Sequence, residues 1–226
     1  MDYRHELKFL VSDAELEIIR YRLKPLMRSD MHQKEGAYTI RSLYFDDFYD
    51  SCMRENEDGI DNRRKYRIRI YDGSDEVIKL EKKMKCRGMT RKVSTEISKA
   101  DCLTYMSGRP AQLRPDSSEL SKELYAEMKM KGMHPVSIVE YERTAFVEKR
   151  GNVRITFDRN ISACERVGDF LEKRLQAVPL LDKSRHVLEV KYDELLPEYL
   201  SRVLEMGTLQ RTAFSKYYYA RNYKNF

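Results

Sequence analysis

Basic side chains recur at every second position in several segments of the sequence, with acidic side chains mixed among them. In segment 66–71, Arg67 and Arg69 alternate with isoleucines. Successive side chains of a β-strand point to opposite faces, so this spacing puts the charges on one face of a strand. The other faces of this kind contain Arg4, Glu6 and Lys8; Lys79, Glu81, Lys83 and Lys85; Lys92, Ser94 and Glu96; Arg154, Thr156 and Asp158; and Arg185, Glu189, Lys191 and Asp193.

The pattern of these faces has two interpretations. A single charged face is the ordinary solvated side of an open sheet. The same pattern in strand after strand also fits charged faces that point inward, toward an aqueous tunnel. Inside a protein, like charges repel strongly unless something neutralises them. A polyanion with bound divalent cations would do so, and the inward arrangement therefore predicts a binding site for a phosphate chain.

The elements that position these charges are mostly strands. Periodicity and turn residues predict strands at about 3–11, 37–46, 66–71, 77–85, 90–97, 136–148, 153–158 and 186–192. Helices are expected at about 13–26, after a capping-box pattern at Ser12 and Glu15, and at 48–57, 99–106, 117–131 and 195–205. The tail at 214–223 fits a strand or a helix. Together these elements predict a single α+β domain over residues 1–226, with one antiparallel sheet closed into a β-barrel and helices packed outside.

The bulk composition fits either an anionic partner or simply a well-solvated basic protein. The 226 residues include 43 Lys and Arg against 37 Asp and Glu, which gives a formal charge of +6. This excess fits nucleic acid, phosphate or an acidic membrane surface. The cysteines lack the close spacing of a zinc or redox site and are expected to be free thiols. Because no apolar run comes near the roughly 18 residues that cross a bilayer, we expect no transmembrane segment and a cytoplasmic location.

Short motifs in order along almost the whole chain resemble a known family. The run 4–9, RHELKF, is similar to the opening strand of triphosphate tunnel metalloenzymes. It is most similar to the polyphosphate polymerase domain of the vacuolar transporter chaperone (VTC) complex and its free-standing bacterial relatives. Each motif is short, but their joint order is specific. The further matches are SLYFD at 42–46, YRIRIY at 66–71, LEKK at 80–83, YERTAF at 141–146, RITFD at 154–158, LEVK at 188–191 and FSKY at 214–217.

The resemblance implies an antiparallel tunnel of about eight strands, in which basic residues hold phosphates and a glutamate binds Mn²⁺ or Mg²⁺. Glu189 is the implied principal metal ligand, with Glu6 and Glu81 as orienting partners or secondary ligands. Arginine and glutamate suit phosphate and metal binding, because an arginine side chain engages two phosphate oxygens and carboxylates bind hard cations. The implied substrate ligands are Lys8, Arg67, Arg69, Lys83, Lys92, Tyr141, Arg143, Arg154 and Lys216.

Three of these positions have a second interpretation. Arg91 could take the role of Lys92, its neighbour in the sequence. Strict alternation puts Arg143 on a rather apolar face, so either Tyr141 and Arg143 face the tunnel or Arg143 is a structural surface residue. Lys216 is either a phosphate ligand or a solvated helix residue in the tyrosine-rich tail.

The resemblance further implies an ATP-dependent polyphosphate polymerase, which moves the γ-phosphate of ATP onto a growing chain and releases ADP. Arg67, Arg69, Lys83 and Lys216 are the implied catalytic residues. Arg4 stands where the wider superfamily has its first glutamate, which argues against hydrolase members that use both acids. The alternatives are metal-dependent hydrolysis of tripolyphosphate or another triphosphate, and a non-catalytic polyphosphate-binding module. We expect no nucleic acid partner, because a duplex is too wide for a closed tunnel; the sequence indicates no particular oligomeric state.

Overall fold

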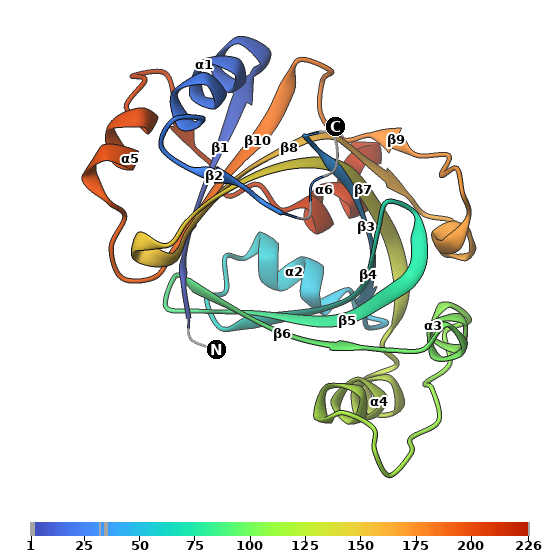
Figure 1. Cartoon of the computed structure of the whole chain (residues 1–226). Helices are drawn as coiled ribbons and strands as arrows, with labels where there is room; N and C mark the ends of the chain where they lie inside the picture. Colours follow the sequence, from blue (N-terminus) through green and yellow to red (C-terminus); the bar gives the residue numbers. More distant parts are fainter. Residues whose placement is uncertain (1–2, 32, 34–35, 226) are drawn as a thin grey trace.

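The protein is built around one strongly curved antiparallel sheet (Figure 1). The computed structural model of the chain describes residues 3–31, 33 and 36–225. Within this part, the main strand order is β11-β1-β10-β8-β7-β3-β4-β5-β6, while β2 pairs with β7 and β9 pairs with β8. The strands are β1 (His5–Ser12), β2 (Arg28–Ser29), β3 (Tyr38–Asp46), β4 (Arg63–Tyr71), β5 (Ser74–Cys86), β6 (Met89–Glu96), β7 (His134–Glu148), β8 (Val153–Cys164), β9 (Val178–Pro179), β10 (Arg185–Tyr192) and β11 (Gln210–Arg211).

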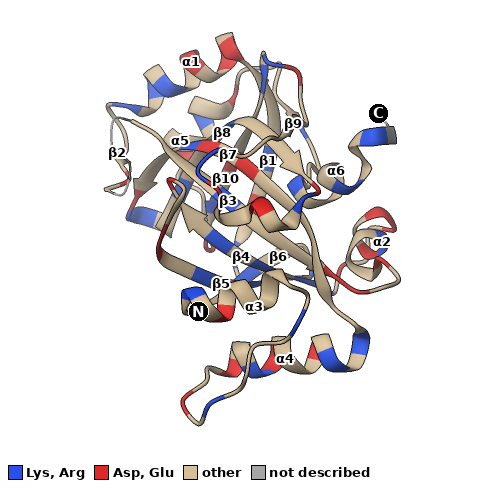
Figure 2. Ribbon diagram, turned by 90° about the vertical axis from the view of Figure 1, so that its right-hand side faces the viewer, with Lys and Arg blue, Asp and Glu red and all other residues tan. Residues whose placement is uncertain are grey.

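The helices lie on the outside of the curve or at one end of it (Figure 1). α1 (Asp13–Leu23) and α5 (Glu198–Leu204) pack together near β1 and β10, and α3 (Lys99–Met106) and α4 (Glu119–Lys131) pack near β5. α2 (Ser51–Glu57) and α6 (Lys216–Asn222) contact each other at one end of the sheet, at the right of Figure 2. None of the helices in the described residues has the length and apolar character of a membrane span.

Local sequence signals explain where several of these elements begin and end. α1 starts with the predicted capping box, in which the Ser12 Oγ accepts from the Glu15 amide and the Glu15 carboxylate accepts from the Ser12 amide. α4 ends at Gly132, which adopts a left-handed backbone conformation with φ of 65°. The C-terminal tail is a helix, α6, whose first turn is capped by the side chain of Ser215.

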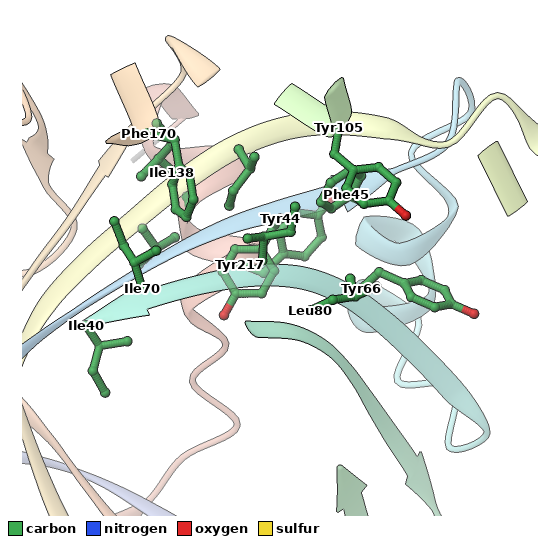
Figure 3. Close-up of a cluster of buried hydrophobic side chains, with 14 of the residues drawn as sticks. Ile40, Tyr44, Phe45, Tyr66, Ile70, Leu80, Tyr105, Ile138, Phe170 and Tyr217 are labelled. Atoms are coloured by element: carbon green, nitrogen blue, oxygen red, sulfur yellow. The ribbon is translucent and has the colours of Figure 1, made fainter. Parts of the chain in front are cut away.

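Two apolar cores lie against the sheet. Beneath α1 and α5, side chains such as Ile19, Leu188 and Leu200 are fully buried against one half of the sheet. The second core joins the other half of the sheet to α3, α4 and the short helix η2 (Val167–Leu171), and Figure 3 shows Tyr105 and Phe170 within it. Each buried side chain of this size contributes about 1.5–3 kcal/mol. The apolar positions of the alternating strands therefore hold the helices on the convex side.

The register of the sheet brings the charged positions together on its concave face. Arg67 lies directly opposite Glu81 on β5, and Lys8 lies directly opposite Glu189 on β10. Directly paired residues of neighbouring strands share a face. Glu81 and Glu189 are almost completely buried. The charged faces therefore point into the curve of the sheet, which we call the interior face, and not to bulk solvent.

The predicted closed barrel is not confirmed. The ladder of strands is open between β6 and β1, where a single isolated bridge joins Arg4 and Thr90. Farther along β1, Phe9 and Leu10 pair with β11 instead, so the two edge strands separate after this bridge. The sheet is nevertheless mostly antiparallel with helices outside, as the α+β expectation stated, and in the described residues it has 11 strands.

Gly151, in the turn between β7 and β8, has a φ of +70°, and a Cβ there would lie well inside van der Waals contact with the carbonyl oxygen of Leu195. We expect Gly151→Ala to lower the free energy of unfolding by about 2 kcal/mol or more, because a left-handed backbone alone costs an L-residue about 1–2 kcal/mol. Gly88→Ala, at φ +74° with open space around the Cβ, should show only the backbone cost. Urea unfolding compares the two variants; equal losses would contradict the steric part of this account.

Candidate functional site: a basic interior face

The interior face holds its charges in three groups of ion pairs. In the first, the Glu81 group, one fully buried carboxylate from β5 meets basic side chains from both neighbouring strands. Its Oε2 lies 2.7 Å from Arg67 Nη2 and 3.5 Å from Arg69 Nη1. Its Oε1 lies 2.7 Å from Lys92 Nζ on β6. One carboxylate therefore balances three cations, and the register of β4, β5 and β6 alone brings them together.

The second group, the Glu6–Glu189 group, joins β1, β10 and β5. Lys83 Nζ lies 2.7 Å from Glu6 Oε1, and Lys191 Nζ lies 2.7 Å from Glu189 Oε2. Lys8 lies between the two carboxylates, with its Nζ 3.2 Å from Glu6 and 3.8 Å from Glu189. Burial alone would raise the pKa of Glu189, but the ammonium groups of Lys191 and Lys8 outweigh it and hold that pKa well below its usual range.

The third group, the Asp158 group, connects the sheet with α6. Arg143 makes a bidentate pair with Asp158, with nitrogen–oxygen distances of 2.6 and 2.7 Å. Lys216 Nζ lies 2.6 Å from the same carboxylate and 4.6 Å from the ring centroid of Tyr141. Arg143 also comes within 3.5 Å of Glu189. The Asp158 and Glu6–Glu189 groups are thus in contact, and the interior face is electrostatically continuous between them.

These three groups contain more positive than negative charge. Their carboxylates are the four of Glu6, Glu81, Asp158 and Glu189. Burial, together with nearby Lys8, lowers the pKa of Lys83 to about 8 even though Glu6 acts against the shift. An unbalanced buried charge is costly, so this face is suited to receive an anion. The basic members are Lys8, Arg67, Arg69, Lys83, Lys92, Arg143, Lys191 and Lys216.

The structure shows where the side chains lie at the three positions that the sequence left open. Lys92 lies on the interior face, whereas Arg91 pairs with Met84 and lies on the opposite face of β6. Tyr141 and Arg143 both face the interior, and the Tyr141 hydroxyl accepts a hydrogen bond from Arg69 at 3.4 Å. The helical Lys216 is nearly buried, because α6 folds back against β7 and β8.

Arg154 lies apart from the three groups. Its Nη2 is 2.6 Å from Asp30 Oδ2 and donates to the Tyr38 hydroxyl at 3.1 Å. About a third of its side chain is exposed, at 32%. Arg154 thus lies at the edge of the interior face, where a longer anion could reach it.

Sequence reasoning gave no role to three residues of this face. Lys191 and Asp158 had been placed on charged faces by their spacing, but only the register shows which ions they pair with. Lys65 precedes the strand predicted at 66–71, whereas β4 begins at Arg63. The signal that could have found Lys65 is its position two residues before Arg67, on the same face of the strand.

The implied metal ligands are only partly brought together. Glu6 and Glu189 share the contacts of Lys8 and Lys191, while Glu81 belongs to a separate group. Within the residues that the structure describes, no cluster of three or more His, Cys, Asp or Glu side chains is arranged to hold a metal. Two carboxylates fit Mg²⁺ or Mn²⁺ only if substrate phosphates and water supply the other ligands, which is the usual arrangement for Mg²⁺ in phosphate-transfer sites.

Comparison with known families gives a clear assignment. A family model for the VTC domain matches residues 3–223. The chain belongs to the VTC domain family. Membership of this family supports a domain of the triphosphate-tunnel kind and implies a divalent metal.

Two solved structures are similar to this VTC domain. It is similar to a putative adenylate cyclase from Bacillus halodurans, with 12% sequence identity, a TM-score of 0.51 and coverage of 89% of this chain and 86% of that chain. A protein from Pyrococcus horikoshii OT3 covers 99% of this chain and 100% of its own, with 13% identity and a TM-score of 0.49. No curated protein sequence gives a significant match.

The Glu81 group generates a stability prediction. Replacing Glu81 by Gln removes the buried negative charge and leaves Arg67, Arg69 and Lys92 facing one another. We expect the free energy of unfolding to fall by about 3 kcal/mol, the usual cost of breaking a buried ion pair from one side. Tripolyphosphate should restore part of the melting temperature of this variant. A melting temperature equal to that of the wild type would show that Glu81 does not hold these cations together.

Proposed function

We propose that this VTC domain is a polyphosphate polymerase, which transfers the γ-phosphate of ATP to a growing polyphosphate chain and releases ADP. The observation that carries the proposal is the surplus of basic side chains on one buried face, where eight cations meet four carboxylates. A chain of phosphates is the partner that matches the charge of this face and its spread over several neighbouring strands. The location we expect for this activity is the cytoplasm, where ATP is the donor.

In the proposed reaction the interior face acts mainly by binding and orientation. Arg67 and Arg69 engage phosphate oxygens through planar guanidinium groups, and Lys83 and Lys216 neutralise charge as it shifts from the γ-phosphate to the leaving ADP. An acceptor phosphate is already ionised near neutral pH, so its attack on the γ-phosphorus needs no general base. A divalent cation held at Glu6 and Glu189 would supply further neutralisation of the phosphate oxygens.

Lys8, Lys92, Tyr141, Arg143 and Arg154 complete the proposed substrate contacts. Their positions on neighbouring strands would hold successive phosphates in line for transfer, which is where most of the rate enhancement in such reactions originates. Hydrolysis of a triphosphate is the second candidate, since the same face would bind that substrate. Hydrolysis differs in needing an oriented water molecule instead of an acceptor phosphate.

The reaction products distinguish these candidates. We would incubate the purified protein with ATP and Mn²⁺ and measure polyphosphate on gels and ADP by chromatography. Long chains with a matching amount of ADP are the expected result. Orthophosphate as the sole product would assign a triphosphatase, and tight binding of tripolyphosphate without turnover would assign a binding module.

Substitutions on β4 test the phosphate-binding role. Arg67→Ala and Arg69→Ala should each weaken tripolyphosphate binding by about 1.5–3 kcal/mol, the contribution of a hydrogen bond to a charged group. Arg64→Ala is the matched control, because Arg64 lies on the outer face of β4 and pairs with Glu127 of α4. Calorimetric titration with tripolyphosphate measures all three. Equal affinities for the wild type, Arg67→Ala and Arg69→Ala would mean that the interior face does not bind the phosphate chain.

Substitution of Glu189 tests the metal assignment. Glu189→Ala should abolish Mn²⁺-dependent turnover and leave the domain folded, because Lys8 and Lys191 keep Glu6 as a partner. Glu142→Ala removes an acid that is 45% exposed and pairs with Arg159, and it should leave turnover unchanged. Turnover assays over a range of Mn²⁺ concentrations compare the metal dependence of the variants with that of the wild type, and thermal unfolding shows whether each variant is folded. Wild-type metal dependence in Glu189→Ala would contradict the assignment.

A further inference from the structure

Lys65 differs from the other basic residues of the interior face in the groups that it contacts. It lies on β4 directly opposite Lys83, so it faces the interior. Its Nζ donates to Asn56 Oδ1 at 2.9 Å and to Ser215 Oγ at 3.2 Å, and it lies 5.0 Å from the ring centroid of Tyr217. In the described part of the chain, no ion pair joins Lys65 to a carboxylate. The protein itself therefore gives this lysine only uncharged partners.

The surroundings of Lys65 are electropositive. Burial, followed by the nearby charges of Arg63 and Lys8, lowers the pKa of Lys65 to about 7. From the other packed elements it faces Lys83 on β5 and the buried thiol of Cys52 on α2, whose own pKa is raised by burial. Tyr217 of α6 donates its hydroxyl proton to Asp46, away from Lys65. Glu55 of α2 also lies near enough to interact electrostatically with Lys65, but in the described residues no ion pair joins the two. The Lys65 ammonium therefore lacks an anion in direct contact.

Lys65 lies where the interior face reaches α2 and α6. Asn56 belongs to α2, and Ser215 caps α6. Asn56 also lines a surface hollow together with Glu57, residues 212–214, Tyr218 and Tyr219. At the same end, Lys8 donates to the backbone carbonyl of Phe214 at 2.9 Å. Through Asn56, Lys65 thus connects the interior face to a residue that lines this hollow.

We propose that Lys65, with the side chains of Asn56 and Ser215, forms a further phosphate subsite at the α2–α6 end of the interior face. This inference rests on the proposed phosphate-chain function and adds to it the end at which the chain extends beyond the ion-pair groups. The Lys65 ammonium would pair with a phosphate oxygen. The Asn56 amide nitrogen and the Ser215 hydroxyl can each donate a further hydrogen bond, because both groups are donors as well as acceptors.

The subsite has a consequence that a purely structural lysine would not have. An anion beside Lys65 favours its charged form, so phosphate binding above neutral pH should draw a proton onto the amine. Calorimetric titration with tripolyphosphate at pH 8, in two buffers of different ionisation enthalpy, measures the affinity and the number of protons taken up. We expect the wild type to bind with a Lys65-dependent proton uptake.

Two substitutions separate the charge of Lys65 from its titration. Lys65→Met should raise the Kd for tripolyphosphate at least tenfold, equivalent to about 1.4 kcal/mol. Lys65→Arg should retain most of the affinity and lose the proton uptake assigned to Lys65, because a guanidinium is always charged. Lys82→Met is the control, since Lys82 lies on the outer face of β5 and pairs with Glu123, and it should change neither quantity.

The outcomes distinguish this subsite from the wider function. Two results would overturn the subsite and leave the proposed function standing. One is an affinity for tripolyphosphate in Lys65→Met equal to that of the wild type. The other is a proton uptake in Lys65→Arg equal to that of the wild type. A wild-type protein that does not bind tripolyphosphate would overturn both. Thermal unfolding of each variant confirms that it is folded, and Lys65→Arg still tests the proton uptake if Lys65→Met is destabilised.

Discussion

The surplus of buried positive charge on the concave side of one sheet is the constraint on which the rest of the structure depends. Buried charges are tolerated only when they are paired and hydrogen-bonded. Here each carboxylate serves several cations, as when Glu81 contacts Arg67, Arg69 and Lys92. The pairing gives each of these cations a carboxylate partner, but it leaves net positive charge. A bound phosphate chain would neutralise the remaining positive charge. We infer that the protein's own carboxylates stabilise the interior face when no phosphate chain is bound.

The positions of the apolar core and of the helices follow from the charged character of the interior face. Because alternate side chains of every strand point inward, where the charges lie, most of the apolar core is built from the outward positions, and most of the helices pack on the convex side. The helices α2 and α6, which contact each other at one end of the sheet, are the exceptions, and α6 packs Tyr217 5.3 Å from Tyr44 and places Lys216 beside Asp158. The open edge between β6 and β1 also fits this arrangement: a site that depends on charges from neighbouring strands does not require the last pair of strands to be continuously bonded.

The alternation of charged and apolar residues along the sequence predicts part of the fold and part of the candidate site. Arg67 and Arg69 alternate with isoleucines, so both their strand and their shared face could be predicted. Lys65 was missed, because the charged run 63–65 has no apolar alternation that extends the predicted strand back to Arg63, although its spacing from Arg67 puts it on the same face. Lys216 was recognised by its motif, but its contact with Asp158 depends on how α6 folds back. The separation of Glu81 from Glu6 and Glu189, like the open edge of the sheet, is set by long-range register that no local pattern records.

We propose that the interior face binds a chain of phosphates, which balances its surplus positive charge. The most direct test is the melting temperature of the protein as tripolyphosphate is added, compared with orthophosphate at the same ionic strength. A ligand that binds only the folded state stabilises it in proportion to the logarithm of its concentration above the Kd. We predict a concentration-dependent rise with tripolyphosphate that orthophosphate does not match. Equal shifts with both anions, or no shift with tripolyphosphate, would contradict the account.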